Sequence, residues 1–351
     1  MTRHHVRADD GSGFAVLDFG GAITEVRVPD RWGRMRDVTL GWPDAAGYER
    51  NDAYLGVVIG RCANRVAGGE LPVGGRTHAL PRNEGRHHLH GGPGGFHVRT
   101  WGVRPVGTAA GPREEADGTD RDEGGVELWR ISPAGEEGYP GRLEVRVRMT
   151  WSLAHALRIV FHATADAPTV VNLTQHPYWN LAGSGTILDH DLTVHADAYT
   201  PVDADGIPTG QIAPVTGTPF DLRAGGRLTR VVTADDPAIR AAGGLDHNYV
   251  LRPADPGVAG CTAAATLSDP RSGRRLQVRT TAPGLQAYSG NGLGGGRAGH
   301  AGRPYARHGG IALEAQGFPD APHHPYFPSW AVTPEAPFRR EVVYAFGADA
   351  R

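Results

Sequence analysis

Alternation between apolar and polar positions dominates this chain and predicts β-strands. Over residues 143–151 the apolar side chains share one face, while Glu144, Arg146 and Arg148 lie on the other. The alternation resumes over residues 157–163 after a short break, which predicts a hairpin with one face in solvent. Strand-like patterns recur at residues 14–19, 22–28, 37–42, 126–131, 169–175, 191–197, 247–251, 263–269, 275–281, 310–316 and 341–346.

Helical patterns are scarce by comparison. We expect one short helix, at about residues 233–242, among a dozen or more short strands. This arrangement predicts an all-β fold, a large antiparallel β-sandwich, rather than alternating βα units. No shift in composition marks a domain boundary, so we expect a single domain over residues 1–351. Two Gly-rich segments, 111–125 and 292–310, are expected to be exposed loops.

Composition and charge narrow the function classes. The 51 glycines and 27 prolines favour turns over long helices. The chain has no lysine, so its 36 basic side chains are all arginine. Schiff-base chemistry, pyridoxal phosphate anchoring and Walker-type phosphate loops are therefore excluded. A formal net charge of −2 gives no basic surface for nucleic acid or an anionic membrane.

The cellular setting follows from the cysteines and the N-terminus. Cys62 and Cys261 form no CxxC pair or framework, so a reducing compartment is expected and the predicted location is cytoplasmic. The N-terminus lacks the apolar stretch of about 7–15 residues that a signal peptide contains. The sequence contains no run of about 18 apolar residues, so we expect no membrane span.

The first candidate for chemistry is His176, in the segment NLTQHPYWNLAG (172–183). A strand leads to this histidine and ends at Pro177, and histidine exchanges protons near neutral pH. Tyr178 and Trp179 offer flat apolar faces, and Asn180 offers an amide. A sugar needs this combination, because its C–H face packs on rings while its hydroxyls form hydrogen bonds. The alternative interpretation is a structural histidine at a strand end.

The second candidate is Glu314, which lies inside the otherwise apolar strand 310–316. A carboxylate in such a position is either paired or has a raised pKa, and a raised pKa suits a general base. The alternative is a glutamate that forms an ion pair with one of the many arginines.

Further polar residues interrupt apolar or Gly-rich stretches. Asn64 and Arg65 follow an apolar run, and an arginine fork can hold neighbouring hydroxyls. His90 precedes two glycines, where the backbone can approach a ligand closely. Asp246 precedes a strand and could accept hydrogen bonds from hydroxyls. A solvated arginine and a turn-capping aspartate remain the alternative interpretations.

Metal, serine-nucleophile and dinucleotide chemistry are not indicated. His87, His88 and His90 are close in sequence, as are His323 and His324, but adjacent residues of a strand point to opposite faces. The sequence contains no HExxH, no GxSxG and no GxGxxG placed after a strand. We therefore expect no metal and no cofactor.

Six segments, in this order and spacing, resemble the aldose 1-epimerase (galactose mutarotase) family. They are NRVAGGEL (64–71), LHGGPGGFHVRTW (89–101), NLTQHPYWNLAG (172–183), LDHNYVL (245–251), LQAYSGN (285–291) and ALEAQGFPDAPHHPYFPS (312–329). The resemblance runs from about residue 13 to about residue 348. The sequence departs slightly from the residues usual in the family at Trp179 and at His323–His324.

The resemblance implies a fold, an activity and roles for residues. It implies a β-sandwich of the galactose mutarotase type that uses no cofactor, with His176 as general acid and Glu314 as general base. The residues implied to bind the sugar are Asn64, Arg65, His90, Tyr178, Asp246 and Gln286. The loops 111–125 and 292–310 match the family less well and are expected to lie away from the site.

The implied function is that of an isomerase that interconverts the α and β anomers of free hexoses such as galactose and glucose. Its partner would be a small-molecule aldose, and the protein would be a monomer or a homodimer. Two alternatives remain open at this stage: an epimerase of hexose 6-phosphates, which would need arginines around the phosphate, and a carbohydrate-binding sandwich without catalysis.

Overall fold

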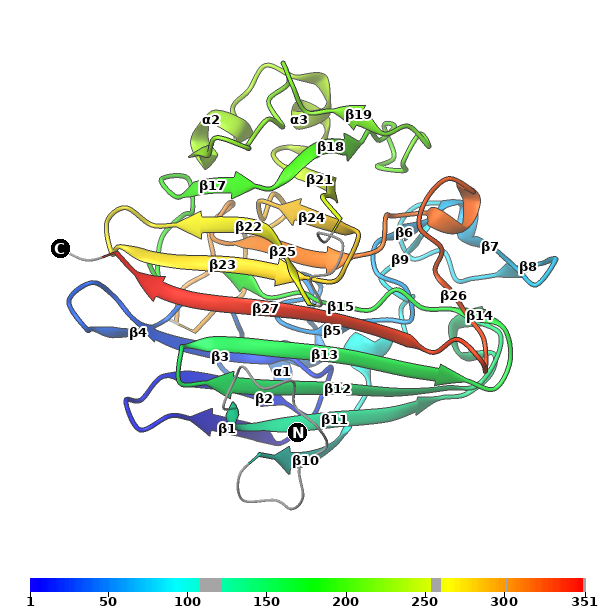
Figure 1. Ribbon diagram of the computed structural model, residues 1–351, viewed down its shortest axis with the longest axis horizontal. Coiled ribbons are helices and arrows are strands. Elements are labelled where there is room, and N and C mark those ends of the chain that lie inside the picture. The colour runs from blue at the N-terminus through cyan, green and yellow to red at the C-terminus, as the bar shows by residue number, and fades with distance from the viewer. Residues whose placement is uncertain (108–121, 254–259, 301, 350–351) are drawn as a thin grey trace.

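A nine-stranded antiparallel sheet is the largest element of the fold (Figure 1). The computed structural model describes residues 1–107, 122–253, 260–300 and 302–349, so most of segment 111–125 lies outside the described residues. In spatial order the sheet contains β10 (Gly102–Val106), β11 (Asp122–Ser132), β12 (Leu143–Ser152), β13 (Ala156–Ala165), β27 (Phe338–Ala348), β23 (Arg274–Thr280), β22 (Thr262–Ser268), β17 (Asp191–Val194) and β20 (Gly226–Arg227). Strands β12 and β13 form the predicted hairpin, with Val147 opposite Phe161 on the buried face.

Two smaller antiparallel sheets form the second layer, which Figure 1 shows behind the nine-stranded sheet. One contains β16 (Tyr178–Trp179), β25 (Ile311–Gln316), β24 (Gly284–Tyr288), β21 (Asp246–Leu251), β18 (Ala196–Thr200) and β19 (Ala213–Pro214). The other contains β1 (Arg3–Arg7), β2 (Gly13–Leu17), β3 (Ile23–Pro29) and β4 (Met35–Asp37). One apolar core joins Val147 of β12, Phe14 of β2 and Leu313 of β25. The predicted antiparallel β-sandwich is therefore confirmed.

Short strand pairs and short helices complete the structure. The pairs are β5 (Val58–Ile59) with β15 (Thr174–Gln175), β6 (Arg65–Val66) with β9 (His88–Leu89), β7 (Glu70–Val73) with β8 (Arg76–Ala79), and β14 (Thr169–Val170) with β26 (Ala331–Val332). The helices are α1 (Ala45–Glu49), α2 (Leu228–Val232) and α3 (Pro237–Ala242), with 3-10 turns η1 (Ala67–Gly69), η2 (Phe96–Val98), η3 (Glu136–Gly138) and η4 (Ala321–His323). None of the helices in the described ranges has the length and apolarity needed to cross a bilayer.

Helix α3 begins and ends as its sequence predicts. The Asp236 side chain accepts hydrogen bonds from the backbone N–H groups of Ala238 and Ile239, and proline follows this N-cap. Gly243 ends the helix in the left-handed conformation, with φ of 68°. The sequence did not predict α1 and α2, because α1 has only five residues and α2 is rich in β-branched residues that favour strands.

Three predicted strands are interrupted in the structure. Segment 169–175 divides into β14 and β15 because its two ends pair with different strands, β26 and β5. Segment 191–197 likewise divides between β17 in the large sheet and β18 in the six-stranded sheet. Segment 37–42 contributes only the end of β4 and an isolated bridge from Thr39 to Trp179. Alternation predicts extended backbone here, but not a change of pairing partner.

The fully buried Phe161 provides a test of the core. Phe161→Ala should lower the free energy of unfolding by about 3–5 kcal/mol, because it removes packing from the interior of β13 and leaves a cavity. Thr164→Val, on the exposed face of the same strand, should change it by no more than about 0.5 kcal/mol. Denaturant unfolding measures both values. Equal effects would contradict the assignment of the two faces.

Candidate active site

A cavity of about 480 Å³ opens on the face of the six-stranded sheet that points away from the core. Strand register explains the polar lining. Gln286 of β24 is opposite Glu314 of β25, and Tyr178 of β16 is opposite Ala312, so these side chains share one face. Their neighbours Leu313 and Leu285 point to the opposite face and pack in the core. The strand that contains Glu314 is therefore apolar on one side and functional on the other.

His176 and Glu314, predicted from separate segments, meet in this cavity. The His176 Nε2 atom lies 3.4 Å from Glu314 Oε1, and the two residues are 3% and 2% exposed. His176 is held at the end of β15 by two backbone hydrogen bonds. Its N–H donates to the carbonyl of Val57 at 3.0 Å, and its carbonyl accepts from the N–H of Gly56 at 2.9 Å. The chain thus presents the imidazole to the carboxylate from a fixed backbone.

Burial favours the neutral form of both groups in the free cavity. Desolvation lowers the pKa of His176 to about 4. Desolvation also raises the pKa of Glu314 well above its usual value; the nearby charge of Asp246 adds to this rise, and Arg65 opposes it. The raised pKa of Glu314 agrees with the expectation from its apolar strand. Neither His176 Nδ1 nor Glu314 Oε2 has a hydrogen-bond partner among the described residues.

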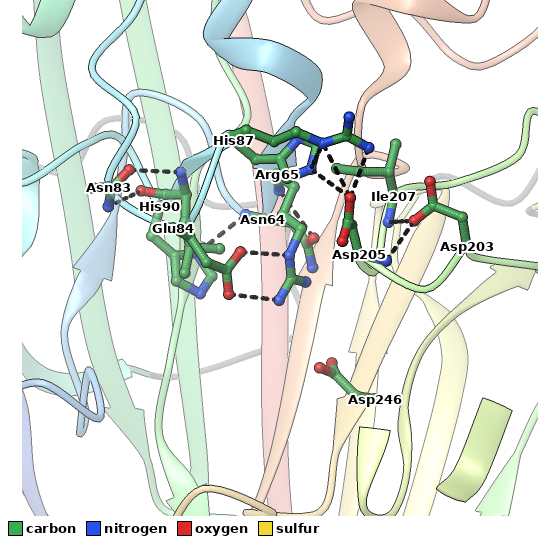
Figure 2. A network of polar contacts seen from close by, with 12 residues as sticks. Asn64, Arg65, Asn83, Glu84, His87, His90, Asp203, Asp205, Ile207 and Asp246 are labelled. Carbon is green, nitrogen blue, oxygen red and sulfur yellow. Dashed lines mark hydrogen bonds and ion pairs between the residues drawn. The ribbon is translucent and has the colours of Figure 1, made fainter. Parts of the chain in front are cut away.

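Asn64, Arg65 and His90 come together because β6 pairs with β9 (Figure 2). The backbone N–H of Asn64 donates to His90 Nδ1 at 3.1 Å, and the N–H of His90 donates to the carbonyl of Asn64 at 3.0 Å. This contact places the proton of a neutral His90 on Nε2, which makes that nitrogen a donor. The Arg65 guanidinium forms a bidentate ion pair with Glu84: Nε donates to Oε2 at 2.6 Å, and Nη2 donates to Oε1 at 2.8 Å.

Asp246, Gln286 and Tyr178 occupy the sheet side of the site. Gln286 Nε2 donates to Asp246 Oδ1 at 2.6 Å, and desolvation raises the pKa of Asp246. The Tyr178 ring lies 4.9 Å from the His176 ring, measured between centroids. Seven of the eight residues that the resemblance assigns to the site line the cavity; Gln286 instead supports Asp246 from the side. Trp179 and Asn180, which were expected to offer a ring face and an amide to a sugar, lie outside the cavity: Trp179 packs in the apolar core, and the Asn180 amide donates to the Gly309 carbonyl.

Several lining residues were not found from the sequence. Tyr54 contacts the rings of His90 and His97, at centroid distances of 4.7 and 4.9 Å. Trp42, Tyr288, Tyr305 and Glu84 also line the cavity. Tyr288 could have been found, because it lies two residues beyond Gln286 and therefore on the same face of β24. The other residues lie in loops or short strand connections, and no periodicity identifies them.

The loop 292–310 was expected to lie away from the site, and this expectation is wrong. The run Gly292–Gly295 lines the cavity, as do Arg297 and Tyr305. The Arg297 guanidinium lies 5.0 Å from the centre of the Trp42 ring and donates to the carbonyls of Gly47 and Arg50. These long-range contacts bring the loop over the cavity, and a Gly-rich composition alone does not predict them.

A metal ion fits this site poorly. His90, His176 and Glu314 offer ligand atoms within 4.8 Å of one another. However, His90 Nδ1 already accepts the N–H of Asn64, so a metal at its Nε2 would have to displace the proton of that nitrogen. The three groups are better suited to exchanging hydrogen bonds and protons with a ligand.

Together the fold and cavity define a β-sandwich protein with a buried acid–base pair in a polar and aromatic site. A family model described as aldose 1-epimerase matches residues 3–345. The chain is 40% identical to galactose mutarotase of Homo sapiens, over 94% of this chain and 90% of that protein. It is 34% identical to aldose 1-epimerase of Escherichia coli (strain K12), over 92% and 88%.

Solved structures of aldose epimerases also resemble this chain. An aldose epimerase homologue from C. elegans superposes with a TM-score of 0.86 at 29% identity, covering 99% of both chains. Galactose 1-epimerase from Lactobacillus acidophilus NCFM gives a TM-score of 0.81 at 29% identity, also covering 99% of both chains. The chain belongs to the aldose 1-epimerase family.

The buried carboxyl of Glu314 should make stability depend on pH. A carboxyl with a raised pKa keeps its proton more tightly when folded, so the folded state loses stability as pH rises from about 4.5 toward the raised value. Glu314→Gln removes this loss. Its melting temperature should match that of the wild type near pH 4.5 and exceed it increasingly toward pH 8.

Melting curves by circular dichroism between pH 4.5 and 8 measure this difference. Glu70→Gln, at an exposed side chain outside the cavity, is the control and should track the wild type. A difference for Glu314→Gln that stays constant with pH would contradict the assigned burial of the ionised form.

Proposed function

We propose that this protein is an aldose 1-epimerase that interconverts the α and β anomers of free hexoses such as galactose and glucose. The observation that carries the proposal is the buried His176–Glu314 pair, 3.4 Å apart on the wall of a cavity lined by aromatic and polar groups. Family membership and relatives named galactose mutarotase and aldose 1-epimerase support the same activity.

The reaction requires the C1–O5 bond of the sugar ring to open and to form again. In our proposal, the Glu314 carboxylate accepts the proton of the C1 hydroxyl while protonated His176 donates to O5 as the bond breaks. The bond electrons move to O5 and C1 becomes an aldehyde carbon. Rotation about C1–C2 presents the other aldehyde face, and the reverse steps close the ring as the other anomer.

The proton balance of the pair fits this cycle. Burial favours a neutral His176 and a protonated Glu314 before the sugar binds. Transfer of one proton between the two groups produces the imidazolium and carboxylate that the reaction needs. A hydroxyl donating to Glu314, together with the positive charge of Arg65, would stabilise the carboxylate. The pair therefore needs no net gain or loss of protons over a complete turnover.

The remaining residues would hold the sugar while C1 turns. Arg65 and Asp246 offer donors and acceptors to neighbouring hydroxyls, and His90 offers its Nε2 proton. Tyr178 and Tyr54 offer ring faces to the C–H surface of the sugar. Asn64 orients His90 through its backbone, and Gln286 orients Asp246.

We further propose that residues 1–351 act as one domain, because one apolar core joins strands from both ends of the chain. The prediction of a reducing, cytoplasmic location is supported by Cys62 and Cys261, which are both free thiols. Whether the protein is a monomer or a homodimer stays a prediction for solution measurement.

Removing either member of the pair should abolish most of the activity. Glu314→Gln and His176→Asn should each slow mutarotation by about 10²–10⁴-fold, because each removes one proton-transfer group. Optical rotation of freshly dissolved α-D-galactose or α-D-glucose measures the rate. Glu70→Gln and His162→Asn, both outside the cavity, should retain the wild-type rate. A near-normal rate in Glu314→Gln or His176→Asn would remove that residue from the mechanism. If the wild type bound the sugar without catalysing mutarotation, the alternative of a carbohydrate-binding protein would be favoured.

Free sugars should be preferred over hexose 6-phosphates. Within the part of the chain that the structure describes, the cavity lining contains the carboxylates of Asp52, Glu84, Asp246 and Glu314 and three arginines, Arg50, Arg65 and Arg297. Arg65 is paired with Glu84, and Arg297 donates to backbone carbonyls. We expect kcat/KM for glucose to exceed that for glucose 6-phosphate by at least about tenfold, since a phosphate would be left without a cluster of charged donors. A preference for the phosphate in the same assay would favour the hexose 6-phosphate alternative.

A further inference from the structure

The Arg65 guanidinium uses one edge for a protein contact and keeps the other for the cavity. Its Nε and Nη2 atoms donate to the two carboxylate oxygens of Glu84, at 2.6 and 2.8 Å. Among the described residues, Nη1 has no hydrogen-bond partner. Because the guanidinium is a rigid planar fork, fixing one edge fixes the direction of the remaining N–H groups.

Glu84 is itself held by a tight turn. Its backbone N–H donates to the carbonyl of His87 at 3.1 Å, and the N–H of His87 donates to the carbonyl of Glu84 at 2.9 Å. Asn83 fastens the base of this turn through a pair of hydrogen bonds with the backbone of Leu89, at 3.0 and 2.8 Å. Figure 2 shows Glu84 facing Arg65, with Asn83 bound on the opposite side.

The loop around Asp205 supports the same assembly from another direction (Figure 2). Arg86 donates to Asp205 Oδ2 at 2.7 and 3.0 Å. The neighbouring Gly206 lies so close to Arg65 that a Cβ atom there would be 3.2 Å from the guanidinium carbon. The guanidinium is thus bounded by a carboxylate along one edge and by backbone on one side.

The held guanidinium acts on the two carboxylates of the site. Its charge opposes the rise in the pKa of Glu314 and of Asp246, so it helps both groups to ionise. If Arg65 were rotated or displaced, its N–H groups would no longer point toward the sugar, and its electrostatic effect on the pKa of Glu314 would change.

We propose that Glu84 is a positioning residue for the epimerase reaction. Its bidentate ion pair holds Arg65 in the orientation that binds the sugar and balances the charge of the site. This inference rests on the proposed function. Glu84 need not touch the reacting atoms C1 and O5, and it acts through Arg65.

Glu84→Gln tests the proposal, because it keeps the size of the side chain but removes its charge and one acceptor oxygen. We expect kcat/KM for mutarotation to fall roughly tenfold to hundredfold, as misplacement of a substrate-holding group does. The charge of Arg65 would also lose its counter-charge. The pKa of Glu314 in the free enzyme should then fall. Because the pair needs the one proton that Glu314 holds in the free enzyme, the alkaline limb of the kcat/KM profile should move to lower pH.

The position of the alkaline limb of the kcat/KM profile is a readout that a merely structural defect would not move to lower pH. The ionisable groups that face Glu314 are His176, His90, Arg65, Asp246 and the phenols of Tyr178, Tyr288 and Tyr344. All of them remain in Glu84→Gln. Glu84→Asp keeps the charge on a shorter side chain, so it should lower kcat/KM while the alkaline limb stays at its wild-type position.

A double-mutant cycle isolates the route through Arg65. Arg65→Ala should lower kcat/KM, and adding Glu84→Gln to it should lower kcat/KM by no more than roughly twofold further. Glu70→Gln, at an exposed glutamate 4.0 Å from Arg82, is the matched control and should behave as the wild type. Circular dichroism of each variant verifies folding.

Two results would overturn the proposal while leaving the function intact: wild-type kcat/KM in Glu84→Gln, or additive losses in the double variant. Failure of the proposed function is distinct, because the wild type and Glu70→Gln would then lack mutarotation activity themselves. In that case the role of Glu84 in this reaction falls with it.

Discussion

Burial of an imidazole and a carboxylate side by side is the constraint on which the site depends. Water would screen and solvate both groups, but His176 and Glu314 are nearly inaccessible and lie 3.4 Å apart. Desolvation moves their pKa values in opposite directions, and the pair keeps its proton within reach of both partners. Such a pair costs folding stability, and that cost is expected where groups are kept ready for proton transfer.

The β-sandwich makes this burial possible by using one strand for two purposes. On β25 the side chain of Leu313 packs in the core, while the adjacent Glu314 points into the cavity. Antiparallel register then aligns β16, β24 and β21 so that Tyr178, Tyr288 and Asp246 project from the same face. The short β15–β5 pair delivers His176 to the edge of this face. The geometry of the site is therefore a consequence of sheet pairing.

The sequence predicts the parts of this account that depend on local periodicity. Alternation identified the long strands of the large sheet, such as β12 and β13, but not the five-residue strands β1, β10 and β24. An acidic residue in an apolar strand identified Glu314. Glu84, Tyr54 and the loop from Gly292 to Gly295 were missed, because their places follow from contacts between segments far apart in the chain. Tyr54 even requires a positive φ of 56°, which local preference disfavours. Division of segment 169–175 between two partners was missed for the same reason: pairing is a property of the whole fold.

A crystal structure with a bound hexose would show directly whether His176 and Glu314 act on the sugar ring. We expect the ring oxygen within hydrogen-bonding distance of His176 and the anomeric hydroxyl within hydrogen-bonding distance of Glu314, with Arg65 on the other hydroxyls. A hexose bound in this cavity with C1 and O5 turned away from both residues would contradict this expectation.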